Sequence, residues 1–440
     1  MSRWPESLGM NFPFWGVPGI GGEIVAGVVS LFFAVAACFA IGGGTFQILL
    51  EHKAQRTGDQ PLLLFLQDWS RFLLLMILIV GLVAWMGVWF LFMLIAPHAT
   101  MAFISICFWL WAGLWILFLA LTVSALFYHS TWGVVSPEDH LSIGWIFVAV
   151  AWLSLFAVNG ALSFMLVPEE WLKTGNTMAA CFAGSFWPSL FMRGSAAIGI
   201  AGLICLVTAS EASPPSLRQH LVLFASSFIM PGFALLPLAA IWHVAVLPPR
   251  MRGMLLSAGS PVTLFFVGAL VLSVIIFAFV AAGPFKRPKS STRAFALLLL
   301  VLGIGVVSTM EWVGGVMRSP YSISDYLYLN GVESRMVPEI RREGFLKHAN
   351  YSAVKSVKGQ EIKAGEEMFR FQCMICHTMH GHNSIKWAMR GWNSGVVDRQ
   401  LENLETLRGN MPPFAGTATE RRALAQWLVS IIERKGEGKK

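Results

Sequence analysis

The sequence predicts an all-α membrane protein in which eight transmembrane helices form a bundle and a small all-α domain follows outside the bilayer. Hydrophobic residues make up 56% of the 440 residues and charged residues only 13%, so the chain is more apolar than a soluble domain of this size. The apolar residues form long runs between positions 23 and 317, whereas residues 330–440 carry charges as densely as a soluble domain does. We therefore expect four regions: an N-terminal segment (1–22), a transmembrane domain (23–330), a linker (331–354) and a C-terminal domain (355–440).

Eight apolar runs are long enough to cross a bilayer as helices, which takes roughly 20 residues at a rise of 1.5 Å each. They cover about residues 23–50, 70–96, 100–128, 142–167, 188–209, 218–245, 258–283 and 293–317. The first run has one feature of a processed leader, because "VAAC" ending at Cys38 is similar to a lipoprotein cleavage site. However, Arg3 is the only basic residue before this run, and apolar sequence continues past Cys38 to Leu50. We predict that the first helix is retained.

The Lys and Arg residues of the short loops predict the orientation, since these residues favour the cytoplasmic side. With the N-terminus outside, the inside loops hold Lys53, Arg56, Arg71, Arg218, Lys286, Arg287, Lys289 and Arg293, and the outside segments hold Arg3, Lys173, Arg250 and Arg252. An even number of spans returns the C-terminal domain to the outside, which is the periplasm for a bacterial inner membrane. We attribute the net charge of +8 to topogenic and solvated residues, and expect no nucleic-acid partner.

The C-terminal region contains Cys373-Met-Ile-Cys376-His377, the attachment motif of a c-type haem. In this motif the two thiols form thioethers with the haem, and the histidine ligates the iron. The preceding "QEIKAGEEMFRFQ" has helical spacing, with Gly365 and Phe369 where small class I cytochromes c place a glycine and an aromatic residue. We predict one covalently bound haem c.

The second iron ligand is predicted in "GNMPPFAGT", about 34 residues after His377. Met411 precedes two prolines there, and a thioether held in a stiff turn gives the His/Met pairing that raises the reduction potential of a cytochrome c. Thr417 or Thr419 is expected to cap a last helix, whose apolar face holds Leu424, Trp427, Leu428 and Ile431. This region resembles a single-haem class I cytochrome c over about residues 355–434.

Two alternatives for the motif are weaker. A structural zinc site would need further ligands, and although His380 and His382 are close by, there is no second cysteine pair. Either histidine as the distal ligand is disfavoured because both are too near His377 to reach across the haem. The remaining cysteines lie in apolar runs and are expected to be small buried hydrophobic residues: Cys38, Cys107, Cys181 and Cys205.

Placing polar residues inside membrane spans costs free energy, so such residues are candidate functional residues. The candidates are Glu23, Arg193, His243, Glu311 and Arg318. Other histidines fall at helix ends or in loops, where an interfacial position is expected: His52, His98, His129, His140 and His220.

Several membrane segments resemble subunit I of the cytochrome bd quinol oxidases. "WVGGVMRSPYSISDYLYLNG" (312–331) is similar to the family segment that contains Gly-Arg-Gln-Pro-Trp, and three other stretches are similar to transmembrane segments of the family: "AWLSLFAVNGALSFML" (151–166), "LFMRGSAAIGIAGL" (190–203) and "SSFIMPGF" (226–233). The resemblance covers about residues 20–330 and implies a scaffold that, in the family, holds haems b and d and reduces oxygen.

The chain departs from this family at the haem ligands. The resemblance places the ligand positions of the low-spin haem b at Arg193 and Met230, and that of the high-spin haem b at Gly315. A guanidinium stays protonated and has no lone pair for iron, although Arg193 could face a haem propionate or a partner's carboxylate. Residues 20–50 contain no histidine for the haem of the oxygen site, and the quinol-binding loop is reduced to "LPPRMRGM". We expect haems b and d to be absent, with Glu311 as the one alternative, displaced ligand.

These observations favour an electron-transfer subunit over a complete enzyme. The predicted protein is a membrane-anchored monohaem cytochrome c subunit of a respiratory complex, whose partners are other membrane subunits, lipid and a soluble periplasmic carrier such as a cytochrome c. The alternative is a bd-like terminal oxidase subunit that takes electrons from a soluble cytochrome c and reduces oxygen. A quinone-linked module is a third possibility.

Overall fold

The computed structural model describes residues 15–349, 352–407 and 411–433. Arg3, most of the expected N-terminal segment and the charged end of the chain lie outside the described residues. The chain forms two compact units. The first combines residues 1–29, 87–108 and 318–440, and the second combines residues 30–86 and 109–317.

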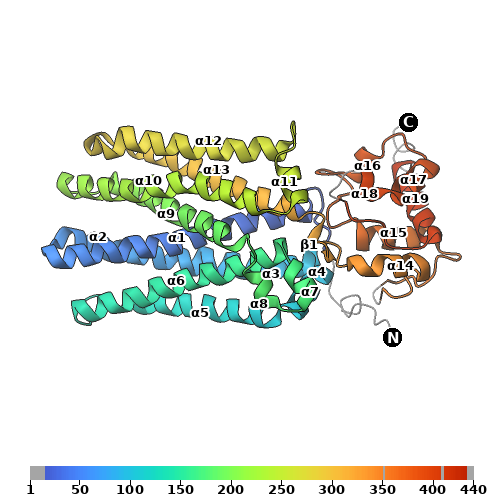
Figure 1. Cartoon of the computed structure of the whole chain (residues 1–440), viewed down its shortest axis with the longest axis horizontal. Helices are drawn as coiled ribbons and strands as arrows, with labels where there is room; N and C mark the ends of the chain where they lie inside the picture. The colour runs from blue at the N-terminus through green and yellow to red at the C-terminus, as the bar shows by residue number, and fades with distance from the viewer. Residues whose placement is uncertain (1–14, 350–351, 408–410, 434–440) are drawn as a thin grey trace. The chain divides into compact units, whose positions relative to one another are not determined.

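Eight helices of the described residues are long and apolar enough to cross a membrane, which confirms the predicted number. Their α-helices are labelled in Figure 1. The spans are α1 (Gly22–Thr57), α2 to α3 (Gln60–Ile95), α5 (Phe108–Ser130), α6 (Pro137–Leu166), α9 (Phe186–Ala209), α10 (Pro215–Val246), α12 with η3 (Pro261–Phe285) and α13 (Arg293–Arg318). The second span joins α2 (Gln60–Leu75), the π-helix η2 (Met76–Leu82) and α3 (Val83–Ile95), and η3 (Ala281–Phe285) is a π-helix as well.

The second span begins ten residues before its predicted start, so the expectation that Arg71 lies in a loop is wrong. Asp59 caps α2 by accepting a hydrogen bond from the backbone N–H of Leu62, and a proline follows in the first turn. These are strong helix-start signals, and they outweigh the polar residues that lower the hydropathy of this segment.

Helices α9 and α10 form the most buried pair of the second unit. They approach closely at Gly232, where an added Cβ would lie 2.6 Å from the Cα of Gly199. Small residues at such crossings let helix backbones come together in a bilayer, where packing replaces the hydrophobic effect. Helix α12 packs on α10 and α6 packs on α9. The connections hold the short helices α7 (Glu169–Thr174), α8 (Thr177–Cys181), α11 (Pro249–Leu255) and η4 (Pro288–Ser290).

The first unit contains the remaining elements. A two-stranded antiparallel hairpin, which the sequence did not predict, joins β1 (Tyr321–Ile323) and β2 (Leu327–Tyr328). The helices are α4 (Pro97–Ile106), η5 (Ser334–Met336), α14 (Val337–Glu343), α15 (Glu361–Gln372), α16 (Ile385–Ala388), α17 (Ser394–Glu402), α18 (Leu404–Leu407) and α19 (Ala418–Glu433). The described part of the chain is therefore mostly helical, as predicted, with one small hairpin.

The core of the C-terminal region lies between α15 and α19. A Cβ at Gly365 would lie 2.3 Å from the carbonyl oxygen of Ala423, so only glycine permits this crossing. Next to it, the rings of Phe369 and Trp427 lie 5.2 Å apart, and Leu424 and Leu428 are buried on the predicted face of α19. The two residues singled out in α15 thus hold the first and last helices together.

The segment predicted as a linker, 331–354, contributes to the same core. Its apolar side chains Val337, Ile340, Phe345 and Leu346 are buried against the helices of the C-terminal region. The buried carboxylate of Glu420, on α19, accepts hydrogen bonds from the backbone N–H groups of Phe345 at 3.0 Å and Leu346 at 2.8 Å. Part of this segment therefore packs as an ordered layer on α19.

Candidate haem site and polar clusters of the membrane helices

The Cys-Met-Ile-Cys-His motif follows directly on α15. The backbone N–H of Cys373 still bonds to Phe369, and the N–H groups of Cys376 and His377 both donate to the carbonyl of Cys373, at 3.1 and 2.9 Å. This tight turn brings both thiols and the imidazole to the end of one helix. Burial raises the pKa of each thiol to about 12.

Asn383 orients the imidazole of His377. Its carbonyl oxygen lies 3.2 Å from Nδ1 of His377, and because a carbonyl only accepts, Nδ1 carries the proton and Nε2 keeps its lone pair. The backbone of Asn383 has a φ of 48°, and its side-chain amide donates to the carbonyl of Cys376 at 2.7 Å. A backbone partner on the far ring nitrogen is typical of a metal-ligating histidine, so His377 is prepared to ligate iron through Nε2.

The predicted distal turn is fixed to the motif by Gln372, the residue before Cys373. The side chain of Gln372 donates to the carbonyl of Ala415 at 2.5 Å and accepts from the N–H of Ala415 at 3.0 Å. Arg341 adds a bond from Nε to the carbonyl of Phe414 at 3.1 Å. Met411 lies at the start of this turn and is partly buried; its ligation of iron stays a prediction.

A capping box follows the turn and starts α19. The hydroxyl of Thr417 accepts from the N–H of Glu420 at 3.2 Å, and the carboxylate of Glu420 accepts from the N–H of Thr417 at 2.8 Å, which satisfies two otherwise unpaired donors. Of the two threonines considered for the cap, Thr417 has this role. The turn that would hold the distal ligand is therefore held by hydrogen bonds from two polar side chains, those of Gln372 and Glu420.

The described residues do not provide a further ligand set around the cysteines. They contain no group of three or more His, Cys, Asp or Glu side chains that could hold a metal ion. The ring of His380 lies 3.4 Å from Nζ of Lys386, and the backbone of His382 bonds to the carbonyl of Gly19. The chemistry of the donors fits a thioether-linked haem better than a zinc site.

Arg193 lies in a polar cluster of the second unit. Its guanidinium donates to Oδ1 of Asn159 at 3.1 Å and lies 3.4 Å from the carboxylate of Glu311. Ser189 donates to the same Asn159 oxygen at 2.8 Å. The sequence did not single out Asn159, although it lies in one of the segments that resemble the oxidase family. Arg193 therefore meets a carboxylate of its own chain.

The members of this cluster lie at one depth. Arg193 is seven residues from the start of α9, Asn159 seven residues from the end of α6, and Glu311 seven residues from the end of α13. At 1.5 Å per residue this is about 10 Å from the helix ends. His243, three residues from the end of α10, is buried, and its Nδ1 has no hydrogen-bond partner among the described residues. Met230 is partly buried on α10 and packs against the core.

Comparison with known proteins separates the two parts of the chain. Residues 360–428 match the family model described as cytochrome c oxidase, cbb3-type, subunit III. The structure is similar to that of the bd oxidase from Geobacillus thermodenitrificans, with a TM-score of 0.59 and 12% sequence identity over 68% of this chain and 87% of that chain. No curated protein matches the sequence significantly.

The chain joins a bd oxidase-like membrane domain to a cytochrome c domain. The predicted resemblance to both families is thus confirmed at the level of the fold, and the cytochrome c domain implies a covalent haem c. At 12% identity the similarity of the membrane domain shows the fold alone. Whether the membrane domain holds haems has to be argued from its own residues.

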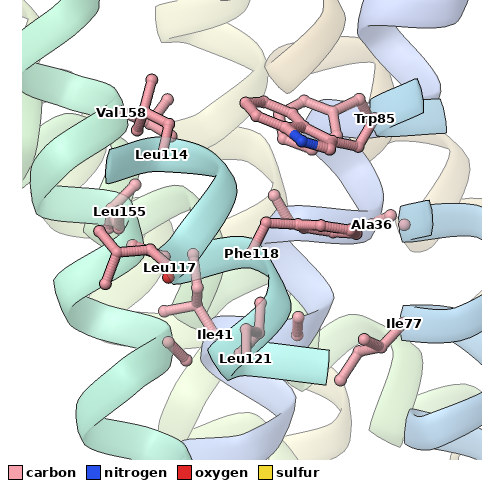
Figure 2. Close-up of a pocket in the computed structure, with 16 residues that line it drawn as sticks. Ala36, Ile41, Ile77, Trp85, Leu114, Leu117, Phe118, Leu121, Leu155 and Val158 are labelled. Atoms are coloured by element: carbon pink, nitrogen blue, oxygen red, sulfur yellow. The ribbon is translucent and has the colours of Figure 1, made fainter. Parts of the chain in front are cut away.

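An apolar cavity of about 80 Å³ lies between α1, η2 with the start of α3, α5 and α6 of the membrane domain (Figure 2). Trp85, Phe118, Leu114 and Leu155 line it, and Ser154 is its polar residue. Cavities with such linings stay dry. The third span, α5, thus borders a small void.

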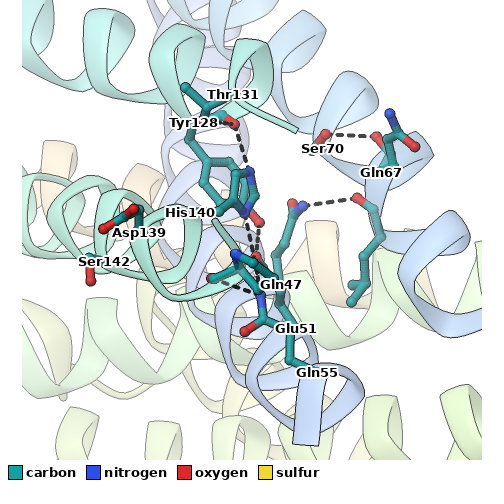
Figure 3. A network of polar contacts seen from close by, with 12 residues as sticks. Gln47, Glu51, Gln55, Gln67, Ser70, Tyr128, Thr131, Asp139, His140 and Ser142 are labelled. Atoms are coloured by element: carbon teal, nitrogen blue, oxygen red, sulfur yellow. Dashed lines mark hydrogen bonds and ion pairs between the residues drawn. The ribbon is translucent and has the colours of Figure 1, made fainter. Parts of the chain in front are cut away.

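A buried network at the other end of α1 was missed by the sequence analysis (Figure 3). Glu51 is fully buried, and its carboxylate accepts from Tyr128 and lies 2.6 Å from Nδ1 of His140, while Gln55 donates to it at 2.8 Å. His140, expected near the membrane interface, lies in the first turn of α6 and is buried there. Because the carboxylate needs buried partners, the network joins α1, α5 and α6.

Proposed function

We propose that this chain is a membrane-anchored electron-transfer subunit of a respiratory complex, with one haem c on the periplasmic face of a bacterial inner membrane. The arrangement of His377 carries the proposal: it completes a Cys-x-x-Cys-His motif, and Asn383 holds its Nδ1 so that Nε2 can ligate iron. Cys373 and Cys376 would form the thioethers, and Met411 would be the distal ligand.

The haem c, when bound, supplies a reversible one-electron couple. The protein's own residues hold its ligands in place and limit access to them. Gln372 fixes the turn that carries Met411, and Glu420 fixes the start of α19 beside it. Met411 and His377 together would raise the reduction potential of the haem, which would suit a carrier late in an electron-transfer chain.

The Arg193 cluster supports a membrane domain without haems b and d. In the resemblance, Arg193 stands at an iron-ligand position, and the guanidinium is already paired with Glu311 and Asn159. A cluster whose charges compensate one another is stable without a cofactor, because neither charge is left unpaired in the bilayer. Glu311, engaged in this way, is a poor substitute ligand.

The orientation rests on the loop charges and on the even number of spans. One compact unit supports this orientation. It contains the segment before the first span, the segment between the second and third spans, and the segment after the eighth span. An even crossing number requires these three segments to share one side of the membrane. Partners would be other membrane subunits and lipid around the apolar helices, and a soluble cytochrome c at the exposed domain.

The second candidate is a terminal oxidase subunit that takes electrons from a soluble cytochrome c. The bd oxidase-like fold favours it. It would require haem ligands in the membrane domain other than those at Arg193 and Gly315.

Single-turnover kinetics of the purified chain separate the two candidates. The protein is reduced, excess reductant is removed, and it is mixed either with oxygen or with a ferric soluble cytochrome c. The proposal predicts electron transfer to the ferric cytochrome and no oxygen consumption beyond that of a control in which Cys373 and Cys376 are both replaced by alanine. Stoichiometric oxygen consumption by the chain alone would establish the oxidase reading instead.

A further inference from the structure

The haem-attachment loop, residues 374–383, is bonded to the segment that precedes the first span. The backbone N–H of His382 donates to the carbonyl of Gly19 at 2.8 Å, and Gly19 and Gly381 form a parallel bridge. A Cβ at Gly381 would lie 2.0 Å from the carbonyl oxygen of Gly19. The two backbones are therefore in direct contact, with no room for a side chain.

The two residues between the cysteines face the same segment. A Cβ at Gly16 would lie 2.1 Å from the sulfur of Met374. Ile375 is buried with Val17 and with residues at the end of α3 and the start of α4, Ile95, Ala96 and Ala99. Cys376 is partly buried against this cluster. The loop thus buries apolar side chains that a freely moving domain would expose to water.

The two segments that contact the loop, the N-terminal segment and the corner between α3 and α4, are themselves held by further contacts. The N–H of Trp15 donates to the carbonyl of Leu94 at 2.8 Å, which ties the N-terminal segment to α3. At the start of α4, the ring of His98 lies 5.9 Å from that of Phe371, two residues before Cys373. A Cβ at Gly331 would lie 2.3 Å from the Cβ of His98. Two separate parts of the chain, the N-terminal segment and the corner between α3 and α4, therefore contact the haem-attachment loop.

We propose that the haem-attachment loop is a docking element that holds the cytochrome c domain in one orientation on the outer ends of α1 and α3, so that the domain is not a carrier on a mobile tether. The proposal rests on the attachment of haem c to this loop. Cys376, which would carry one of the two thioethers, is partly buried against the helix ends, so a diffusible electron partner would have to use another surface.

The test uses the full chain with Gly381→Ala and the matched control Gly391→Ala. Both glycines have a positive φ, 98° and 83°, so both substitutions strain the backbone alike, but nothing lies within 4 Å of a Cβ at Gly391. Hydrogen exchange at the His382 amide, whose acceptor is Gly19, reports docking directly. Linear dichroism of the haem absorption in oriented bilayers reports whether the domain has one orientation.

We expect a protected His382 amide and a dichroic haem in the unmodified chain. Gly381→Ala should speed exchange at His382 at least tenfold and reduce the dichroism, whereas Gly391→Ala should change neither. Equal effects of the two substitutions, or fast exchange and an isotropic haem in the unmodified chain, would overturn the proposal.

A second variant guards against loss of haem attachment in Gly381→Ala. This variant is Gly16→Leu, because Gly16 is outside the residues that match the cytochrome family model. Gly27→Leu is its control, because a Cβ at Gly27 meets nothing within 4 Å. Gly16→Leu should likewise speed hydrogen exchange at the His382 amide. Unchanged exchange in this variant would contradict the docking proposal. Electron transfer to a soluble cytochrome tests the proposed function separately, since an undocked haem c can still exchange electrons in solution.

Discussion

Replacing Gln372 with leucine should release the turn that carries Met411. Gln372 is buried, and its amide makes two bonds to the backbone of Ala415. Leucine keeps the volume but leaves the N–H and the carbonyl of Ala415 without these partners. Each buried unsatisfied group costs about 1–3 kcal/mol, so the turn should lose about 2–6 kcal/mol of stability.

The assay is guanidinium unfolding of the oxidised protein, followed at the weak sulfur-to-iron absorption band that reports Met411 on the iron. Gln372→Leu should lose this band at a much lower denaturant concentration than the unmodified chain, while the covalent haem content stays constant. Gln360→Leu is the control, because Gln360 is exposed at the start of α15 and its side chain makes no capping bond. A difference below about 0.5 kcal/mol between the two variants, within the range of ordinary surface substitutions, would refute the role given to Gln372.

Three further outcomes follow from the same contacts. Met411→Leu should lower the midpoint potential in a redox titration and abolish the sulfur-to-iron band; if both are unchanged, Met411 is not the ligand. Glu420→Gln should destabilise the cytochrome c domain by about 1–3 kcal/mol in denaturant unfolding, because the amide cannot accept all the bonds of the carboxylate; an unchanged midpoint would show that α19 starts without it. Glu51→Ala should lower the melting temperature of the membrane domain in detergent without altering haem c, since it leaves His140 and Tyr128 buried without their acceptor; unchanged melting would show that the network contributes no stability.

Local patterns predicted much of this molecule. The eight spans follow from apolar runs of about 20 residues, and the packing of α15 on α19 follows from Gly365, Phe369 and the apolar stripe that includes Trp427. The haem motif is recognisable from five residues. The early start of α2 is also encoded in the sequence, in the Asp59 cap and the proline after it, both of which precede the apolar run from which the span was predicted.

Contacts between distant segments could not be predicted in this way. Glu51 meets Tyr128 and His140 from two other helices, and no periodicity links residues so far apart. The same applies to Gly19 and Gly381, whose bridge depends on the tertiary fold. The β1–β2 hairpin has strands of three and two residues, which are too short for an alternating pattern to be visible.

The resemblance to the oxidase family predicted the fold of the membrane domain, and the departures at the ligand positions gave the expectation that haems b and d are absent. Arg193 was noted as a departure, and the structure adds that Glu311 and Asn159 already engage it. A single sequence cannot show such a pairing, because the two partners lie on α13 and α6. The charge compensation within this cluster is the main physical argument for a membrane domain without haem b.

The haem content of the purified full-length chain tests the central claim most directly. A pyridine haemochrome spectrum, combined with a protein determination, gives the number and type of haems per chain. The account predicts one haem c, lost when Cys373 and Cys376 are both replaced by alanine, and no haem b or d. Haem b or d in stoichiometric amount would contradict it and would show that the membrane domain binds its cofactors through residues other than those at the family positions.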